Sequence, residues 1–511
     1  MQRGGVLNIQ VEYNNEIREF ECTEGTTVLD VLQQHSIPVR ATCGGVGKCR
    51  KCQVMVRDSE GLRYELACEQ HVSPGMLVVV GDAGTMDVVE EGSSIAFKPD
   101  EGASGLGVAV DIGTTTLAAH LHDLATGARL ASASRPNPQI AFGADVISRI
   151  SASIDGKLPQ MTGLIVDAMA DMRDQLLEGV HAGNVDAPAM PLAIAGNTVM
   201  QHIAAALPPD SIGVNPFTPL SLFGDMHKID GLGNCYFSPC IAGYVGGDIT
   251  AGLLARGFDD GRTRLLLDLG TNGEMALSHA GRIACCATAA GPVFEGANVR
   301  FGMPAGPGAI SQVSLVDGNV NINVIGDGAP IGICGTGIID AVALMVETGV
   351  VDETGYLLDA DDAEDEGIEL AGWLGEEDDG NVFYLTEDHT LFITQADVRS
   401  MQLAKAAVCA GVHTLMEAHN VTCNQIEGLE IAGGFGRYLN LASAARIGLF
   451  PAELLDRAAS VGNTSAEGAS AMLISHKART RAEQIVESCD YLELSTSASF
   501  NGFYVDMMEF A

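Results

Sequence analysis

Residues 108–116 read VAVDIGTTT, and residues 265–274 read LLLDLGTNGE. Each stretch is an apolar strand that ends in Asp-x-Gly-Thr, which places carboxylates at Asp111 and Asp268. Amides and hydroxyls at such a turn cradle phosphate oxygens, and the carboxylate holds Mg²⁺, often through water. One copy is weak evidence, because many strands end this way. Two copies in one chain indicate a phosphate-binding cleft built from two related halves.

The two motifs resemble the phosphate loops of the superfamily of actin, the sugar kinases and the heat-shock chaperones, whose two lobes are related by internal duplication. The resemblance implies a duplicated α/β, actin-like (ribonuclease H-like) ATPase domain over residues 107–511, with a first lobe at 107–255 and a second at 262–511. It also implies ATP and Mg²⁺ as cofactors. The residues that would hold them are Asp111, Gly113, Thr114, Thr115, Asp268, Gly270, Thr271 and Asn272.

Three further segments resemble elements of this superfamily and follow in the expected order. YVGGDITAGLLA at 244–255 is similar to the first connecting helix, where Asp248 would orient the attacking water or a Mg²⁺-bound water. GNTSAEGASAML at 462–473 resembles the second connecting helix, whose small residues allow close packing at the hinge. IAGGFGRY at 431–438 looks like the adenosine motif, in which glycines let the backbone approach the nucleotide. Those glycines are Gly433, Gly434 and Gly436.

Other glycine-rich segments are less specific. AIAGNTVMQH at 193–202 and ICGTGIIDAV at 333–342 place glycines immediately before predicted helices. Helix N-termini bind phosphate, so nucleotide contact and simple turn chemistry both stay open there. The segment at 289–310, AAGPVFEGANVRFGMPAGPGAI, predicts a long shaped loop that lines the cleft or meets a partner.

Cysteine spacing singles out one segment near the N-terminus. TCGGVGKCRKC at 42–52 and ELACEQ at 65–70 combine to C-x5-C-x2-C-x15-C. The four cysteines are Cys43, Cys49, Cys52 and Cys68. Three thiolates from a short glycine-rich loop and one distant thiolate suit a [2Fe–2S] cluster. A structural zinc site is the alternative, but zinc ribbons usually pair two C-x2-C knuckles and this segment has one.

Patterns around these cysteines predict a small sheet. Alternating apolar and polar residues predict strands, and a threonine before an apolar run predicts a capped helix. The expected strands are VLNIQVEY at 6–13, IREFECT at 17–23, CQVMVR at 52–57 and MLVVVGD at 76–82, with a helix in TTVLDVLQQH at 26–35. This order resembles the plant-type and adrenodoxin-type ferredoxins, which implies an α+β β-grasp domain at 1–90. Residues 91–106 are expected to form a flexible linker.

Composition limits the partners. The chain has 511 residues, with 66 acidic and 28 basic ones and a formal net charge of −38. That charge argues against non-specific binding to nucleic acid or to an anionic membrane. No apolar run reaches the ~20 residues of a membrane helix, and the start lacks the apolar stretch of a signal peptide. We therefore expect a cytoplasmic protein whose 13 cysteines form no disulfide framework.

Together these segments resemble one family, the reductive activators of corrinoid enzymes. The motifs that carry the resemblance, besides the four cysteines, are DIGTTT, AGNTVM, GYVGGD, DLGTNGE, AAGPVFEGA, CGTGIID, QLAKAAV and AGGFGRYL. Some members have a middle domain between linker and first phosphate loop. Because Val108 follows the linker directly, we expect that domain to be missing or reduced here.

The resemblance implies an ATP-hydrolysing iron–sulfur enzyme that reduces cob(II)amide to cob(I)amide in a corrinoid protein of a methyltransferase system. The implied partners are that corrinoid protein and a reduced ferredoxin or other low-potential electron donor, with a homodimer as an option. The implied catalytic residues are Asp111, Asp248 and Asp268.

Three other functions stay open at the level of sequence. One is an ATP-driven electron donor to a different low-potential metalloenzyme. Another is a non-redox kinase or chaperone-like ATPase whose four cysteines hold a structural metal ion. The third is a ferredoxin-like binding module whose ATPase part is inactive and binds no nucleotide. The spectrum of the purified protein, metal analysis and calorimetric titration with nucleotide separate the three from the first interpretation.

Overall fold

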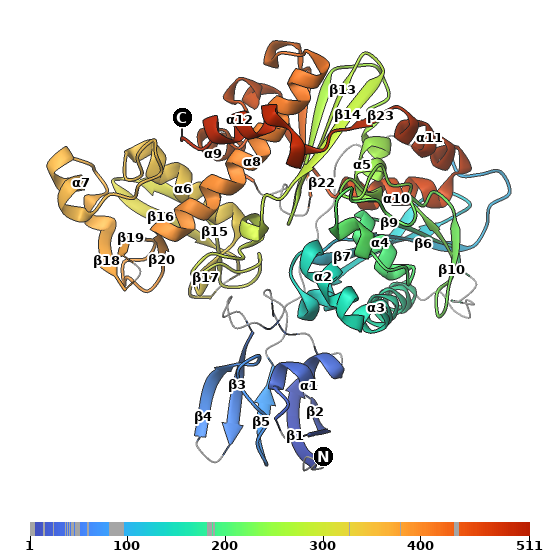
Figure 1. Cartoon of the computed structure of the whole chain (residues 1–511), viewed down its shortest axis with the longest axis horizontal. Helices are drawn as coiled ribbons and strands as arrows, with labels where there is room; N and C mark the ends of the chain where they lie inside the picture. The colour runs from blue at the N-terminus through green and yellow to red at the C-terminus, as the bar shows by residue number, and fades with distance from the viewer. Residues whose placement is uncertain are drawn as a thin grey trace.

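The computed structural model describes most of the chain. Residues outside the description are 1–5, 14–15, 24, 36, 38, 40, 42–44, 46–51, 59–60, 81–96, 181–186, 188–189, 327, 379, 434–438 and 511. Figure 1 shows a small N-terminal sheet domain and two larger sheets with helices around them. Among the described residues, no helix is both long enough and apolar enough to cross a membrane.

The N-terminal domain is one sheet covered by one helix. Its five strands lie in the order β2-β1-β5-β3-β4, with β1 and β5 parallel in the centre. The elements are β1 (Val6–Tyr13), β2 (Glu16–Thr23), α1 (Val28–Gln34), β3 (Gln53–Asp58), β4 (Gly61–Leu66) and β5 (Leu77–Val79). Thr27 caps α1 in a capping box with Asp30, as its threonine predicted. The sequence patterns predicted every element except β4.

The first lobe contains a six-stranded sheet in the order β10-β11-β9-β6-β7-β8. Its strands are β6 (Leu106–Ile112), β7 (Thr116–Asp123), β8 (Arg129–Pro136), β9 (Leu192–Gly196), β10 (Met226–Ile229) and β11 (Gly233–Phe237). Its helices are α2 (Val146–Ala152), α3 (Leu158–Gly179), α4 (Thr198–Ala204) and α5 (Gly247–Arg256), with short helical turns η1 (Pro138–Phe142), η2 (Ser153–Lys157) and η4 (Asp210–Gly213).

The second lobe contains a sheet in the order β22-β21-β12-β13-β14-β23 and two three-stranded sheets. The main strands are β12 (Arg264–Leu269), β13 (Gly273–His279), β14 (Arg282–Thr288), β21 (Gly428–Ala432), β22 (Ala458–Gly462) and β23 (Cys489–Tyr491). The small sheets contain β15 (Ala309–Val316), β16 (Asn319–Val324) and β17 (Gly332–Ile333), and β18 (Leu374–Glu377), β19 (Gly380–Tyr384) and β20 (Phe392–Thr394).

Seven described α-helices accompany these strands. They are α6 (Gly335–Thr348), α7 (Ala360–Glu366), α8 (Gln395–His419), α9 (Leu441–Arg446), α10 (Thr464–Ile474), α11 (His476–Glu487) and α12 (Ala498–Asp506). Short turns η5 (Pro292–Glu295), η6 (Ala371–Trp373), η7 (Cys423–Gln425), η9 (Ala452–Arg457) and η10 (Leu494–Thr496) join them.

The two large sheets repeat one topology. β6 pairs antiparallel with β7 and parallel with β9, and β12 pairs in the same way with β13 and β21. In both sheets the strand that ends in Asp-x-Gly-Thr therefore lies inside the sheet, with an antiparallel neighbour on one side and a parallel neighbour on the other. This duplication is what the two sequence motifs predicted.

Helices α5 and α10 pack against each other between the two large sheets (Figure 1). A Cβ on Gly252 would lie only 2.8 Å from Thr464 Oγ1, so the two helix backbones nearly touch. The small residues expected at the hinge therefore have a packing role.

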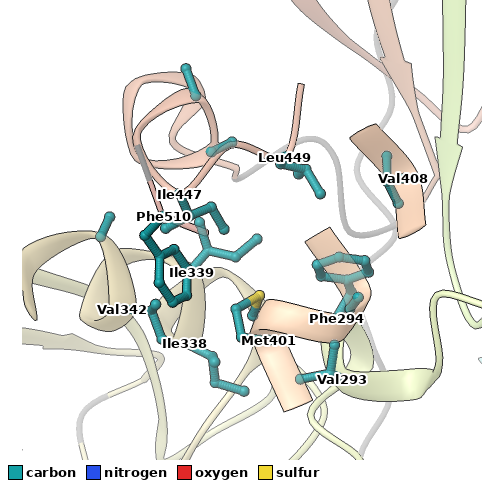
Figure 2. Packing of buried hydrophobic residues seen from close by; sticks show 14 of the residues in the cluster. Val293, Phe294, Ile338, Ile339, Val342, Met401, Val408, Ile447, Leu449 and Phe510 are labelled. Atoms are coloured by element: carbon teal, nitrogen blue, oxygen red, sulfur yellow. The ribbon is translucent and has the colours of Figure 1, made fainter. Parts of the chain in front are cut away.

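One large apolar core holds the second lobe together. Figure 2 shows Phe294 and Val293 of η5 packed among side chains of α6 and α8, with Phe510 from the C-terminal end in the same cluster. Phe294 is 1% exposed and Phe510 is 3% exposed. The turn η5 is thus anchored at its base, which fixes the residue that follows Phe294.

Candidate nucleotide and iron–sulfur sites

The first candidate phosphate loop, residues 113–115, follows β6 and is held by residues from two other elements. A Cβ on Gly113 would lie 2.5 Å from the carbonyl oxygen of Thr116, so only glycine allows this tight turn. The Asn137 side chain donates to the Gly113 carbonyl oxygen at 2.8 Å, and the Asn137 amide donates to the Thr115 carbonyl oxygen at 2.7 Å. Arg149 Nη2 donates to the Thr114 carbonyl oxygen at 2.5 Å. The loop backbone is therefore fixed by the protein's own side chains.

Arg149 is a buried cation beside this loop. Its side chain is fully buried, and Nε and Nη1 donate to Gly143 O at 3.2 Å and Gln139 Oε1 at 3.3 Å. Burial lowers the pKa of its guanidinium to about 9, while Asp145 and Glu295 act in the opposite direction. A guanidinium keeps its charge at neutral pH under these conditions, so it contributes positive potential where phosphate would bind.

The second phosphate loop follows β12 and is closed by the end of β21. Gly433 has φ +100°, and a Cβ there would lie 2.6 Å from Leu269 O and 3.0 Å from Asp268 Oδ1. Glycine at this position lets the candidate adenosine segment pass directly against the loop. The Gly270 amide donates to the Asn272 carbonyl oxygen at 3.0 Å, which shapes the turn itself. Gly434 and Gly436 lie outside the described residues.

The two loops meet at one carboxylate oxygen. Thr115 Oγ1 donates to Glu295 Oε2 at 2.6 Å, and Thr271 Oγ1 donates to the same oxygen at 2.9 Å. The structure thus brings the two motifs together across 156 residues of sequence, the separation of positions 115 and 271. Glu295 belongs to the shaped loop at 289–310, but no sequence signal singled it out.

Four acidic side chains lie near one another at the base of the two loops. Asp111 and Glu274 are buried, and Asp248 and Asp268 are partly exposed. Asp111 accepts hydrogen bonds at 2.7 Å from Ser465 Oγ and at 2.8 Å from Asn463 Nδ2, both at the start of α10. The acidic cluster is defined as Asp111, Asp248, Asp268 and Glu274. Asp111 and Asp248 come from the first lobe, and Asp268 and Glu274 come from the second.

The acidic cluster has raised pKa values. Burial, and then the charges of Asp268 and Asp111, raise the pKa of Asp248 to about 8. Burial and the charge of Asp111 raise the pKa of Asp268 to about 7. Burial also raises the pKa of Glu274 well above its usual value, and Glu274 Oε1 has no hydrogen-bond partner among the described residues. Carboxylates crowded in this way favour a bound cation.

The geometry of the acidic cluster fits a cation that is shared with a ligand. Within the described part of the chain, no three His, Cys, Asp or Glu side chains stand close enough to hold a metal ion by themselves. Mg²⁺ is usually bound through one or two carboxylates, water and substrate phosphates, so this arrangement is compatible with Mg²⁺ that arrives with a nucleotide.

Asp248 reaches the cluster because α5 begins against the first lobe's strand β9. A Cβ on its N-cap residue Gly246 would lie 2.5 Å from the Cα of Asn197. Asn197 caps α4 and also donates from Nδ2 to Thr114 Oγ1 at 3.0 Å. In the segment at 193–202, Asn197 therefore both caps a helix and contacts a side chain of the first phosphate loop. By contrast, a Cβ on Gly337 would lie 2.4 Å from Ile310 O, so close helix packing accounts for that glycine in 333–342.

Two of the four cysteines lie in the described part of the N-terminal domain. Cys52 precedes β3 and Cys68 follows β4, and their Sγ atoms are 3.3 Å apart. Two sulfur ligands of one tetrahedral metal ion lie roughly 3.8 Å apart, so the pair fits a shared metal ion with little movement. Gly45 has φ +89°, and a Cβ there would lie 2.8 Å from Leu29 Cδ2, so glycine lets the backbone at this position pass close to α1. Cys43 and Cys49 lie outside the described residues.

Family models match almost the whole chain. The model described as the 2Fe–2S iron–sulfur cluster binding domain matches residues 11–73, which include all four cysteines. The model of the RACo middle region matches residues 106–261, and that of the C-terminal domain of RACo, the ASKHA domain, matches residues 262–511. The match to the RACo middle region begins at Leu106, the first residue of β6, and so covers the first lobe itself. That a further domain between the linker and the first phosphate loop is missing or reduced stays a prediction.

Known proteins of similar sequence and structure match most or nearly all of the chain. The chain is 29% identical to the corrinoid activation enzyme RamQ of Eubacterium limosum over 95% of this chain and 96% of that protein. It is 26% identical to the [Co(II) methylated amine-specific corrinoid protein] reductase of Methanosarcina barkeri, over 78% of this chain and 76% of that protein. The solved structure of a reductive activator for corrinoid, iron-sulfur protein matches with a TM-score of 0.69 and 27% identity, covering 99% of this chain and 98% of that one.

Proposed function

Because the chain belongs to the family of reductive activators of corrinoid proteins, we propose that it returns an inactive cob(II)amide protein to the cob(I)amide state at the expense of ATP. The observation that supports this most directly is the meeting of Thr115 and Thr271 at Glu295. Two phosphate loops converge there in a chain whose N-terminal domain brings two cysteine thiols within 3.3 Å.

The N-terminal domain holds the redox group in this proposal. Cys43, Cys49, Cys52 and Cys68 would bind a [2Fe–2S] cluster, which supplies one electron at a potential of about −400 mV for the plant-type class. The thiols of Cys52 and Cys68 are shielded from bulk water, since Cys52 is 1% exposed and Cys68 is partly buried.

The two lobes hold MgATP. In this proposal the threonines of both loops bind phosphate oxygens, and the acidic cluster holds Mg²⁺ directly or through water. Asp248, at the first turn of α5, orients a water molecule. Gly433 admits the adenosine side of the nucleotide next to the second loop.

ATP is needed because the electron transfer runs uphill. For one electron, each ~59 mV corresponds to a factor of ten, so a gap of roughly 180 mV requires about 4 kcal/mol. Nucleotide acts only through differential binding: the ATP-bound state must favour the complex in which cobalt has lost its lower ligand. In this proposal the two lobes close on the bound phosphate, and this conformational change couples ATP binding to the state of the complex.

We propose the following domain boundaries, location and partners for the protein. The domains are a [2Fe–2S] domain at 1–90, a flexible linker at 91–106 and the ATPase domain at 107–511. The protein works in the cytoplasm, with a corrinoid protein of a methyltransferase system and a reduced ferredoxin or other low-potential donor as partners. A homodimer is compatible with this scheme.

The experiment has two stages. Iron, sulfide and zinc are first measured in the anaerobically purified full-length protein, together with its visible and EPR spectra. Reduced protein is then mixed with a purified cob(II)amide protein, and the cob(I) absorbance is followed with and without ATP. We expect ATP-dependent cob(I) formation that Cys68→Ser abolishes. Cys423→Ser, outside the proposed site, is the matched control and should behave as wild type.

A colourless protein that contains zinc in place of iron would refute the redox function. Cob(I) formation at equal rate and extent without ATP would refute the ATP dependence alone.

A further inference from the structure

Glu295 lies between the two loops that are proposed to bind phosphate. Its Oε2 accepts a hydrogen bond from Thr115 in the first lobe and from Thr271 in the second. Both hydroxyls belong to the loops expected to bind phosphate. A carboxylate oxygen that accepts from both therefore occupies the position that a phosphate oxygen of a bound nucleotide would take.

The backbone at Glu295 is rigid. Phe294 is buried in the core of the second lobe (Figure 2), and the Gly296 amide donates to Val293 O at 2.9 Å. Gly296 has φ +74°, and a Cβ there would lie 2.3 Å from Met303 O, so the next residue is fixed as well. Movement on ligand binding must therefore come from the Glu295 side chain or from a shift of the lobes. The carboxylate stays close to the phosphate position in either case.

Each threonine hydroxyl has a single proton to donate. A hydroxyl that donates to Glu295 cannot donate to phosphate at the same time, and a carboxylate beside a triphosphate is repelled by it. Binding of ATP must therefore break both hydrogen bonds to Glu295. The displaced carboxylate remains adjacent, where its oxygen can accept a hydrogen bond from another donor.

We propose that Glu295 senses the terminal phosphate of ATP and aligns the water that attacks it. When ATP binds, the hydroxyls of Thr115 and Thr271 donate to the phosphate instead of to Glu295. The Glu295 carboxylate then accepts a hydrogen bond from the attacking water. This inference rests on the proposed ATPase function. It assigns the attacking water to Glu295, which lies outside the two Asp-x-Gly-Thr motifs and the connecting helices, and leaves Asp248 to orient a Mg²⁺-bound water.

The reaction step balances without a further reactant. The water oxygen forms a bond to the γ-phosphorus, and the bond from that phosphorus to the β,γ-bridging oxygen breaks. The electron pair of the broken bond stays with ADP. One water proton passes to the Glu295 carboxylate and then to the released phosphate, which leaves Glu295 ionised for the next cycle.

The test compares ATP binding with ATP turnover in the full-length protein. Calorimetric titration gives the Kd for ATP and for ADP, and phosphate release gives kcat and KM. For Glu295→Gln we expect ATP to bind several-fold more tightly, because a repelling charge is gone, and kcat to fall at least ~100-fold, the range of general-base contributions. ADP, which lacks the terminal phosphate, should bind within about twofold of wild type.

Two other variants complete the design. Thr271→Val removes one donor and should weaken ATP binding, so its effect on Kd has the opposite sign to that of Glu295→Gln. Glu387→Gln, at an exposed loop position, is the matched control and should change neither quantity. If Glu295→Gln does not fold, Glu295→Asp serves in its place, because its shorter side chain cannot reach both hydroxyls; its kcat should fall at least tenfold.

The outcomes are distinct. A kcat within threefold of wild type, or a loss of ATP affinity that matches the loss of turnover, overturns the role of Glu295 and leaves the ATPase function standing. A wild-type protein that neither binds nor hydrolyses ATP overturns both.

Discussion

Gly468 and Ala251 bring the two connecting helices into backbone contact. A Cβ on Gly468 would lie 2.0 Å from the carbonyl oxygen of Ala251, closer than a real Cβ can approach. The same crossing places the start of α10 beside the end of β6, where Ser465 donates to Asp111 at 2.7 Å. The packing of α5 against α10 therefore determines where one carboxylate of the acidic cluster lies.

Gly468→Ala should destabilise the protein and loosen the contact between α5 and α10. Overpacking a helix contact costs about 1–3 kcal/mol, and the carbonyl it meets is backbone that cannot rotate away. We expect a net loss of about 2 kcal/mol in the free energy of unfolding, measured by urea denaturation, and weaker ATP binding. The control is Gly163→Ala in α3, where nothing lies within 4 Å of the new Cβ. That exposed helical substitution should stabilise by up to about 1 kcal/mol. Equal effects of the two substitutions would contradict the close crossing.

Arg149→Lys should break hydrogen bonds that hold the first phosphate loop in place. A lysine cannot reproduce the planar fork that reaches Thr114 O, Gly143 O and Gln139 Oε1 together. Two buried acceptors then lose their partner, which costs roughly 1–3 kcal/mol each. We expect the unfolding free energy to fall by about 3 kcal/mol and the Kd for ATP to rise about tenfold. Arg135→Lys, in an exposed ion pair with Asp171, is the control and should cost under about 1 kcal/mol.

Local patterns predicted the parts of the site that depend on neighbours in sequence. An apolar strand that ends in Asp-x-Gly-Thr is a complete local signal, so the sequence alone identifies Asp111 and Asp268. Thr27 before an apolar run predicted the start of α1 for the same reason. The small residues of α10 indicated close packing, although the sequence did not show which helix they would contact.

Residues that act through distant contacts gave no comparable signal. Glu295 meets Thr115 across 180 positions, and its sequence surroundings show only a glycine-rich loop. Arg149 lies on a short helix, where an arginine is ordinarily a solvated side chain, and its burial follows from packing against the phosphate loop.

His120 should make the protein acid-sensitive. Burial, and then the charges of Arg129 and His122, lower the pKa of His120 to about 3. The unfolded chain takes up a proton near pH ~6.5, whereas the folded chain resists it until about pH 3. Stability is therefore retained above pH ~6.5 and lost as the pH falls toward about 3, by up to about 1.4 kcal/mol per pH unit.

The measurement compares urea midpoints of wild type and His120→Gln between pH 7 and pH 4. His120 and His122 both contact Ser470 Oγ, at 3.2 and 2.9 Å, so protonation also strains the contact of β7 with α10. We expect the variant to be less stable at pH 7 and to have a flatter pH dependence. His71→Gln, at an exposed position, should run parallel to wild type. Parallel curves for His120→Gln and wild type would show that His120 is not the titrating group.

Gly45→Ala should lower the metal content of the N-terminal domain. Alanine at φ +89° is strained, and its Cβ would also lie 2.8 Å from Leu29 Cδ2 on α1 and 3.9 Å from the Cβ of Cys68. Gly25→Ala separates the two effects, because Gly25 has φ +90° but nothing within 4 Å of a new Cβ. Both variants should lose about 1 kcal/mol from backbone strain, as seen in urea denaturation. Only Gly45→Ala should also show less iron and sulfide per chain, because only there does the added methyl push the cysteine loop away from α1. Iron content that is unchanged in both variants would mean that the loop adapts without moving its sulfur ligands.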